Sequence, residues 1–505
     1  MKLREVFDEL SSESLIARHT LSDMDSNITG ITFNSKEVQD GFIFVCKGVK
    51  FKVDYLKEAA QNGAVAYIGE ESFEEDGVDL PAIVVTDVRH AMAILGILFY
   101  DNPSNKMNIV GITGTKGKTT TTHMMKSVLD EWAGHPNCGL ISTTEIIDGK
   151  IRVDSMNTTP EALELQRWLH NMVGNGLDNC SLEVSSQALR YERTYGVNFK
   201  IGIFLNIGRD HISPREHKDF DDYFSAKLML LDQSEICIIN LDMDYLDEVI
   251  AHAEKHSPKY VTYSIENPEA DFFAHDIRKT EKGLEFTVKS KYLPDFEAEF
   301  SIVMAGRFNV SNALSVIAAA TLLGEPVDDI RRGLKDVRVE GRVEVFSSKD
   351  GKIVGIADYA HNKMSYETLI SAMEEEYPEH SKNLYLIFGS VGEKAFERRE
   401  ELGTIAGQRA KKTYITSDEP GNEPFSKIAD EIAEFVEAQG GEYTIIEKRT
   451  EAIEKAFADV EGPTLIMACG YGRLSFQKYG NEYLPIENDV DCIQRCLAEY
   501  DKKHQ

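Results

Sequence analysis

Residues 107–122 read MNIVGITGTKGKTTTT, an apolar run followed by glycines, lysines and threonines. The apolar part predicts a buried parallel strand, and the residues after the loop predict a helix that extends to about residue 132. Between the two, glycines let backbone N–H groups approach phosphate oxygens, and the helix N-terminus adds its positive end. Lys118 supplies a mobile cation, and Thr119 or Thr120 offers a hydroxyl to Mg²⁺. The stretch therefore predicts a nucleotide-phosphate site rather than a glycine-rich turn without a ligand.

Strand-like and helix-like segments alternate beyond this loop. Apolar runs such as CIIN (237–240), GIADYA (355–360) and TLIMACG (464–470) are separated by helical patterns, which predicts an α/β fold with parallel sheets. A chain of 505 residues exceeds one ordinary core and suggests about three domains. We expect them at residues 1–105, 106–342 and 343–505, and the first break falls at a turn-rich stretch before the apolar strand.

Composition excludes several classes of protein. The chain has 85 acidic and 55 basic residues, a net charge of −30, which disfavours binding to nucleic acid or to an anionic membrane surface. No apolar stretch approaches the ~20 residues that span a bilayer, and the charged start is unlike a signal peptide, so we expect no membrane insertion. Seven scattered cysteines without paired spacing predict reduced thiols in a cytoplasm.

The form TGTKGKTT resembles the phosphate loop of the Mur ligases and of their folylpolyglutamate synthetase relatives, with Lys116 where the family more often has asparagine. Residues 31–68 resemble the amino-terminal segment of Mur ligases of the MurE type. The stretch SLEVSSQAL (181–189) resembles the EVSSHAL motif of the same group, and DDYFSAKLMLL (221–231) carries its AK pair. The resemblance covers essentially the whole chain. It implies a three-domain Mur ligase architecture, with a central P-loop ATPase-like parallel-sheet domain and a Rossmann-like carboxy-terminal domain.

The resemblance also implies roles for individual residues. Lys118, Lys227 and His211 would be catalytic, and Lys227 would correspond to the lysine that becomes a carbamate with CO₂. The implied ATP-binding residues are Gly114, Thr115, Lys116, Gly117, Lys118, Thr119, Thr120, Asn309, Arg342 and His361. The implied metal ligands are Thr119, Glu183, His211 and Lys227. The implied substrate-binding residues are Ser35, Thr158, Thr159, Ser185, Arg193, Arg399, Asp418 and Glu419. Taken alone, most of these residues would be interpreted as ordinary surface or loop positions.

The implied reaction joins an amino acid to UDP-MurNAc-L-Ala-D-Glu through an acyl phosphate, with ATP and two Mg²⁺ ions, in a monomer. Asp418-Glu419-Pro420-Gly421 and Cys469-Gly470-Tyr471-Gly472 carry glycine where diaminopimelate-adding relatives have arginine and glutamate. Without the arginine, a distal carboxylate loses its bidentate partner, which disfavours diaminopimelate. Asp418 and Glu419 favour a cationic side chain, and we expect L-lysine.

Other functions stay open at this point. A folylpolyglutamate synthetase shares the phosphate loop, but residues 31–68 speak against it. A simple kinase would work without an amino acid. A MurE-like ligase for another amino acid or acceptor, or a non-catalytic MurE-like paralogue, is the main alternative, because Gly421 and Gly472 replace both polar anchors.

Overall fold

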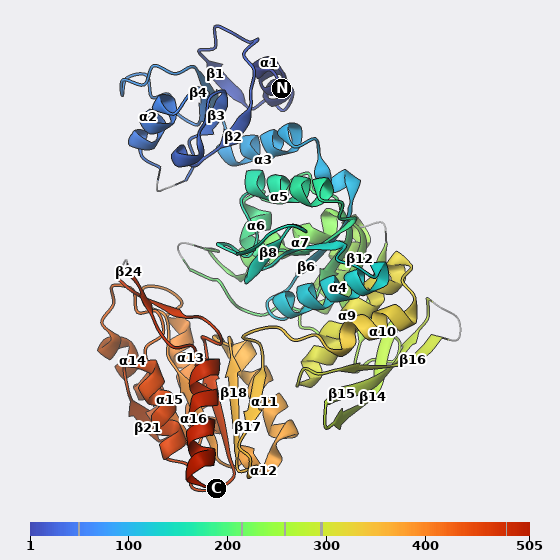
Figure 1. Cartoon of the computed structure of the whole chain (residues 1–505), viewed down its shortest axis with the longest axis vertical. Helices are drawn as coiled ribbons and strands as arrows, with labels where there is room; N and C mark the ends of the chain where they lie inside the picture. Colours follow the sequence, from blue (N-terminus) through green and yellow to red (C-terminus); the bar gives the residue numbers. More distant parts are fainter. Residues whose placement is uncertain (49–50, 214–215, 257–258, 293–295, 481, 505) are drawn as a thin grey trace.

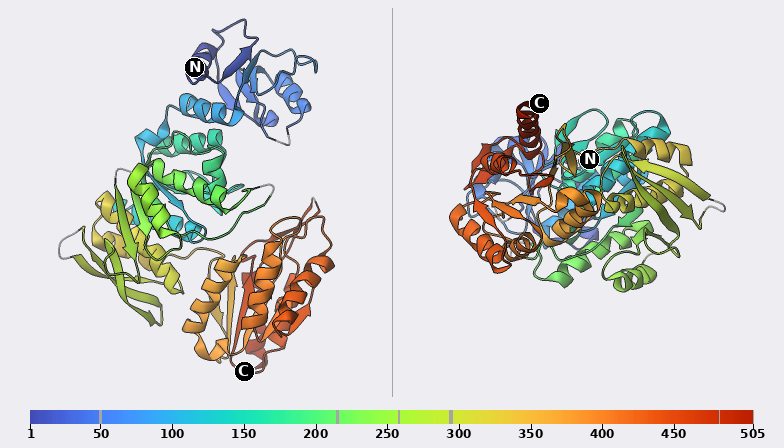
Figure 2. Two further views of the ribbon diagram at one scale, coloured as in Figure 1. Left: turned by 180° about the vertical axis from the view of Figure 1, so that it is seen from behind. Right: turned by 90° about the horizontal axis from the view of Figure 1, so that it is seen from below.

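The computed structural model describes residues 1–48, 51–213, 216–256, 259–292, 296–480 and 482–504. Three sheets follow one another along the chain, and each has its own helices (Figure 1). The first unit lies at one end of the long axis and the third at the other end. Figure 1 and the left view of Figure 2, in which this axis is vertical, show the central unit between them.

The first unit is a five-stranded sheet in the order β1-β5-β4-β3-β2, in which only β1 runs antiparallel to its neighbour. Its strands are β1 (Ile16–His19), β2 (Gly30–Thr32), β3 (Phe42–Val45), β4 (Ala64–Gly69) and β5 (Ala82–Val85). Its helices are α1 (Leu3–Ser12), η1 (Ser35–Glu37), α2 (Val53–Gln61), α3 (Val88–Phe99) and η2 (Pro103–Lys106). The apolar face of α3 shares a core with Ala162 and Leu163 of the next unit, which fixes the two units together.

The central unit is an eleven-stranded sheet in the order β16-β15-β14-β13-β12-β11-β6-β10-β7-β8-β9. The strands are β6 (Asn108–Thr113), β7 (Cys138–Ile141), β8 (Glu145–Ile147), β9 (Arg152–Asp154), β10 (Asn179–Glu183), β11 (Phe199–Phe204), β12 (Ser234–Asn240), β13 (Tyr260–Ser264), β14 (Phe272–Thr280), β15 (Gly283–Ser290) and β16 (Phe296–Ile302). Strand β6 pairs in parallel with β10 and β11, so the carboxyl ends of these three strands meet at one edge.

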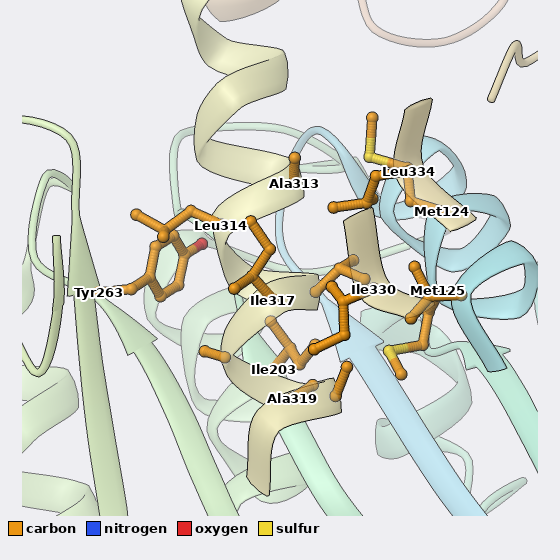
Figure 3. Packing of buried hydrophobic residues seen from close by; sticks show 14 of the residues in the cluster. Met124, Met125, Ile203, Tyr263, Ala313, Leu314, Ile317, Ala319, Ile330 and Leu334 are labelled. Carbon is orange, nitrogen blue, oxygen red and sulfur yellow. The ribbon is translucent and has the colours of Figure 1, made fainter. Parts of the chain in front are cut away.

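Seven helices of the described chain accompany this sheet. They are α4 (Lys118–Ala133), α5 (Ala162–Gly174), α6 (Ser186–Arg190), α7 (Phe220–Asp232), α8 (Leu246–His256), α9 (Arg307–Leu323) and α10 (Val327–Lys335). Helix α9 is apolar on nearly all sides and lies between the strands and α10; Figure 3 shows Leu314 against Tyr263 of β13 and Ile330 of α10 beside Met125 of α4. This packing holds α4, and with it the phosphate loop, in a fixed position.

The third unit is a six-stranded sheet in the order β17-β18-β22-β19-β20-β21, parallel except for β17. The strands are β17 (Glu344–Ser347), β18 (Ile353–Asp358), β19 (Leu384–Phe388), β20 (Lys412–Ile415), β21 (Tyr443–Ile445) and β22 (Thr464–Cys469). A hairpin of β23 (Phe476–Tyr479) and β24 (Glu482–Pro485) follows. The helices are α11 (Lys363–Glu376), α12 (Pro378–Ser381), α13 (Glu397–Arg409), α14 (Phe425–Ala438), α15 (Arg449–Ala458) and α16 (Asp489–Lys503).

The α/β class and the parallel strands predicted from the apolar runs are confirmed, whereas the antiparallel strands β14, β15 and β16 were not predicted. The inward residues of these three strands complete the core around α9, although their other side chains are exposed or only partly buried. All seven cysteines are buried. Within the described ranges, no helix combines the length and the apolar character that a membrane crossing requires. The domain limits at residues 105 and 342 stay predictions.

Candidate active site

The phosphate loop lies between β6 and α4. Gly117 precedes the first helical residue with φ +84, and an added Cβ would lie 2.5 Å from Oδ1 of Asn312, so only glycine fits there. Lys118 Nζ donates to the carbonyl oxygens of Gly114 at 2.9 Å and Thr115 at 3.1 Å, so the ammonium lies over the loop. Burial lowers the pKa of Lys118, and Glu183 opposes that shift.

Glu183 lies at the end of β10, opposite the start of α4. Its carboxylate accepts hydrogen bonds from Thr119 Oγ1 at 3.1 Å and from the Thr143 backbone N–H at 2.9 Å. Parallel pairing of β10 with β6 brings Glu183 level with Ile112, beside the loop. The Thr143 hydroxyl also donates to this carboxylate, at 3.0 Å. The buried carboxylate and the hydroxyls of Thr119 and Thr143 form a set of oxygen ligands of the kind that Mg²⁺ prefers.

Lys227 of α7 lies beneath the loop and is almost completely buried. Its Nζ donates to the carbonyl oxygen of Gly114 at 2.8 Å. Burial, and then the charge of Lys118, lower the pKa of Lys227 well below its ordinary value. Burial at this position therefore favours the neutral amine over the ammonium.

His211 follows Asp210 in the loop after β11 and has a left-handed backbone, with φ +56. Its Nδ1 lies 3.0 Å from Glu216 Oε1, and its Nε2 lies 3.8 Å from Asp210 Oδ2. In the part of the chain that the structure describes, no group of three or more His, Cys, Asp or Glu side chains gathers as a metal site. The metal-binding role of His211 stays a prediction.

The third unit supplies the opposite wall. Arg342 Nη2 donates to Thr119 Oγ1 at 3.2 Å, and the guanidinium lies over the Tyr359 ring. His361 is buried, and this burial lowers its imidazole pKa well below the ordinary value, so the ring is neutral at pH 7. Burial also raises the pKa of Asp418 to about 6, although Arg449 opposes the shift.

These side chains line one cavity of about 360 Å³ between the central and third units. Among the predicted residues, the cavity brings together Thr115, Lys116, Gly117, Lys118, Thr119, Thr120, Thr158, Glu183, Ser185, Arg193, His211, Lys227, Arg342, His361, Asp418 and Glu419. A second cavity of about 440 Å³ adjoins the loop at Lys116, Gly117 and Thr120, and Asn309 lies in its wall. Gly114 contributes only its backbone carbonyl, to Lys118 and Lys227.

Three predicted residues lie elsewhere. Ser35 is buried in the first unit, where Oγ donates to Glu58 Oε2 at 2.5 Å. Thr159 is fully buried and donates to the Glu183 carbonyl oxygen at 2.8 Å, so it braces the wall behind Thr158. Arg399 does not line the cavity, and its guanidinium is buried and paired with Glu423 and Glu431, so its substrate-binding role stays a prediction.

Sequence reasoning also missed functional candidates. Arg398, Tyr359 and Tyr471 line the cavity, and Arg398 points there while its neighbour Arg399 points into the third unit. Successive helical residues are separated by about 100°, so two adjacent arginines at the start of α13 have to face different surroundings. That periodicity is the one signal that would have identified Arg398.

Glycines replace both expected anchors for the added amino acid, and the backbone accounts for them. Gly421 has φ +60, and a Cβ there would lie 2.7 Å from Glu393 Oε2. Gly472 has φ +56 and approaches Gly341 closely. Neither glycine lines the cavity, whereas Gly470 and Tyr471 do.

Comparisons with known proteins identify the family. Residues 112–320 match the Mur ligase middle domain, and residues 341–472 match the Mur ligase, glutamate ligase domain. The chain is 35% identical to a UDP-N-acetylmuramoyl-L-alanyl-D-glutamate--L-lysine ligase from Enterococcus faecalis, over 93% of this chain and 92% of that protein. It is 34% identical to a UDP-N-acetylmuramyl-tripeptide synthetase from Lactobacillus delbrueckii, over 94% of each.

Among solved structures, the fold is similar to that of a UDP-N-acetylmuramoyl-L-alanyl-D-glutamate--2,6-diaminopimelate ligase. The TM-score is 0.65, with 23% identity over 100% of this chain and 99% of that one. At this identity the likeness concerns the fold alone. It extends over all three units, including the first sheet.

Proposed function

Because the chain belongs to the Mur ligase family, we propose that it adds L-lysine to UDP-MurNAc-L-Ala-D-Glu with the consumption of ATP. Members of this family are ATP-dependent ligases that form amide bonds, and this chain is one of them. The observation that supports the proposal best is the shared cavity, because the phosphate loop of the central unit and Asp418 and Glu419 of the third unit line the same space.

The cavity suits a reaction in two steps. An oxygen of the acceptor carboxylate attacks the γ-phosphorus, the bond to ADP breaks, and an acyl phosphate forms. The neutral amine then attacks the acyl carbon, phosphate leaves with the original carboxylate oxygen, and the amine loses a proton. Lys118 and the N-terminus of α4 bind the transferred phosphoryl group in the first step, and Arg342 contacts it from the third unit. Closure of the walls around the substrates would exclude the water that otherwise hydrolyses the acyl phosphate.

The oxygen donors around the loop fit Mg²⁺. Thr119 and Glu183 would hold the ion together with phosphate oxygens and water, as is usual for this metal. When bound, Mg²⁺ neutralises the negative charge of the phosphates. We also propose that Lys227 becomes a carbamate, because burial lowers its pKa and so favours the neutral amine, the form that attacks CO₂. The carbamate would place an anion beside Gly114, under the loop.

The added amino acid is proposed from charge and from the relatives. Asp418 and Glu419 give the far wall of the cavity negative charge, which suits the ammonium of a lysine side chain better than a distal carboxylate. The relative from E. faecalis is named as an L-lysine ligase. The use of ATP and of a nucleotide-linked acceptor fits a location in the cytoplasm, and we propose a monomer.

The test is phosphate release from ATP and Mg²⁺ with UDP-MurNAc-L-Ala-D-Glu and single amino acids. We expect release that requires both the acceptor and L-lysine, with ornithine and diaminopimelate much weaker. Release with the acceptor alone would indicate a kinase, and release with another amino acid would correct the specificity. A Lys118→Ala variant should lose the activity, because the phosphate cation is removed. Absence of release with any combination would support a non-catalytic paralogue.

A further inference from the structure

One buried carboxylate connects the phosphate loop to the third unit. Asp210 follows β11 in the central unit and lies in the wall of the cavity. Its Oδ1 accepts a hydrogen bond from Arg398 Nη2 at 2.9 Å, and its Oδ2 accepts one from Asn362 Nδ2 at 2.5 Å. Lys116 Nζ of the phosphate loop lies 3.5 Å from the same Oδ2. Asp210 therefore has partners on two units at once.

Each partner is fixed by its own element. Asn362 caps the N-terminus of α11, where its side chain accepts a hydrogen bond from the Ser365 backbone N–H at 3.1 Å. Arg398 lies in the first turn of α13 and is 13% exposed. Two helices of the third unit thus converge on Asp210, which is itself 3% exposed. A carboxylate buried to this degree is stabilised as an anion only while these donors stay in place.

Lys116 also lies where the nucleotide phosphates are proposed to bind. It belongs to the phosphate loop and lines both cavities, and its backbone is fixed because Asn206 bonds to its N–H at 2.8 Å and its carbonyl oxygen at 3.0 Å. At 3.5 Å the ammonium lies farther from Asp210 than the three groups that donate hydrogen bonds to this carboxylate, which are Arg398, Asn362 and the His211 backbone N–H. Phosphate oxygens at the loop offer Lys116 more negative charge than a carboxylate that these donors already share.

We infer that Asp210 is a positioning residue that couples nucleotide binding at the phosphate loop to the position of the third unit against the central unit. The coupling passes through Lys116 on the loop side and through Arg398 and Asn362 on the side of the third unit. This inference rests on the proposed function. When nucleotide phosphates attract Lys116, the carboxylate loses its partner on the phosphate loop and keeps the His211 backbone N–H at 3.0 Å together with Arg398 and Asn362, and its bonds to α11 and α13 strengthen. Arg398 then stays in the cavity wall beside Asp418, where the added amino acid is proposed to bind.

The coupling is testable without catalysis. We would measure the radius of gyration by small-angle scattering, with and without a non-hydrolysable ATP analogue, for the full chain and for Asp210→Asn, Arg398→Gln and the double variant. The wild type is expected to become more compact with the analogue, and both single variants are expected to lose most of this change. Arg409→Gln is the matched control, because Arg409 lies on the same helix but pairs with Glu374 inside the third unit.

Kinetics supply the second readout. Each single variant should raise the KM for the amino acid about tenfold while changing the KM for ATP much less, and the double variant should match the worse single one instead of reaching about a hundredfold. If Asp210→Asn does not fold, the same comparison holds for Arg398→Gln and Asn362→Ala. Unchanged compaction in the variants, or effects that multiply, would overturn the inference. Compaction without any ligation would instead count against the proposed function alone.

Discussion

An Arg399→Met variant distinguishes a structural role of Arg399 from a role in substrate binding. The guanidinium donates to Glu423 at 3.0 and 2.7 Å and to Glu431 at 2.5 Å, and its side chain is 2% exposed. In an Arg399→Met variant both carboxylates lose this partner. Breaking a buried pair costs about 3 to 5 kcal/mol, and we expect about 3, because Glu431 is 37% exposed and regains solvation.

Hydrogen exchange of peptides from α13 and α14 measures this loss locally, which avoids treating a three-unit chain as two-state. The KM for the amino acid should change little. Arg409→Met is the control on the same helix, and its half-exposed pair with Glu374 should cost less than about 1 kcal/mol. A large rise in KM together with unchanged exchange protection would refute the structural role.

The same pair has a pH signature. Arg399 holds the pKa of Glu423 at about 2, below the usual 4.5. The stabilisation is therefore fully present above the usual value and is lost as the pH falls from about 4.5 to about 2. The difference in protection between the wild type and Arg399→Met should shrink over that range.

Three further predictions concern the cavity. Lys227→Ala should lower the rate about a hundredfold or more, and short-chain carboxylic acids should restore part of it if a carbamate acts there; no rescue would count against the carbamate. Because the Asp418 carboxyl ionises near pH 6, kcat/KM for lysine should rise as the pH increases through that value, and an Asp418→Asn variant with the same rise would exclude this group. Gly117→Ala, at φ +84, should weaken ADP binding about tenfold or more in calorimetry, and normal affinity would show that the loop tolerates a Cβ.

Much of the fold was predictable because local patterns and the final contacts agree. The run at residues 107–113 is apolar because β6 is a central strand, paired with β10 on one side and β11 on the other, and is buried on both faces. Gly114 and Gly117, which follow it, have a positive φ. The antiparallel strands β14 to β16 were missed. They alternate between buried and exposed positions, and nothing local says that they join a parallel sheet instead of forming a separate one.

The site was predictable where residues lie within or next to the phosphate loop and its strands. Glu183 ends a strand that is parallel to β6, so register alone brings it to the loop. The part of the cavity wall that the third unit supplies was not predictable, because Arg398 and Asn362 reach Asp210 only through the relative placement of two units. The adjacent residues Arg398 and Arg399 of α13 differ for the same reason, because one side of the helix lies against the central unit and the other packs inside the third unit. The sequence does not show which side is which.

Transfer of an isotope tests the central claim most directly. The acceptor would carry ¹⁸O in the carboxylate that is ligated, and the phosphate released with ATP and L-lysine would be analysed by mass spectrometry. Attack by that carboxylate on the γ-phosphorus predicts one ¹⁸O in the phosphate and the other in the new amide. Unlabelled phosphate would mean that water takes up the phosphoryl group, which would contradict the acyl-phosphate route.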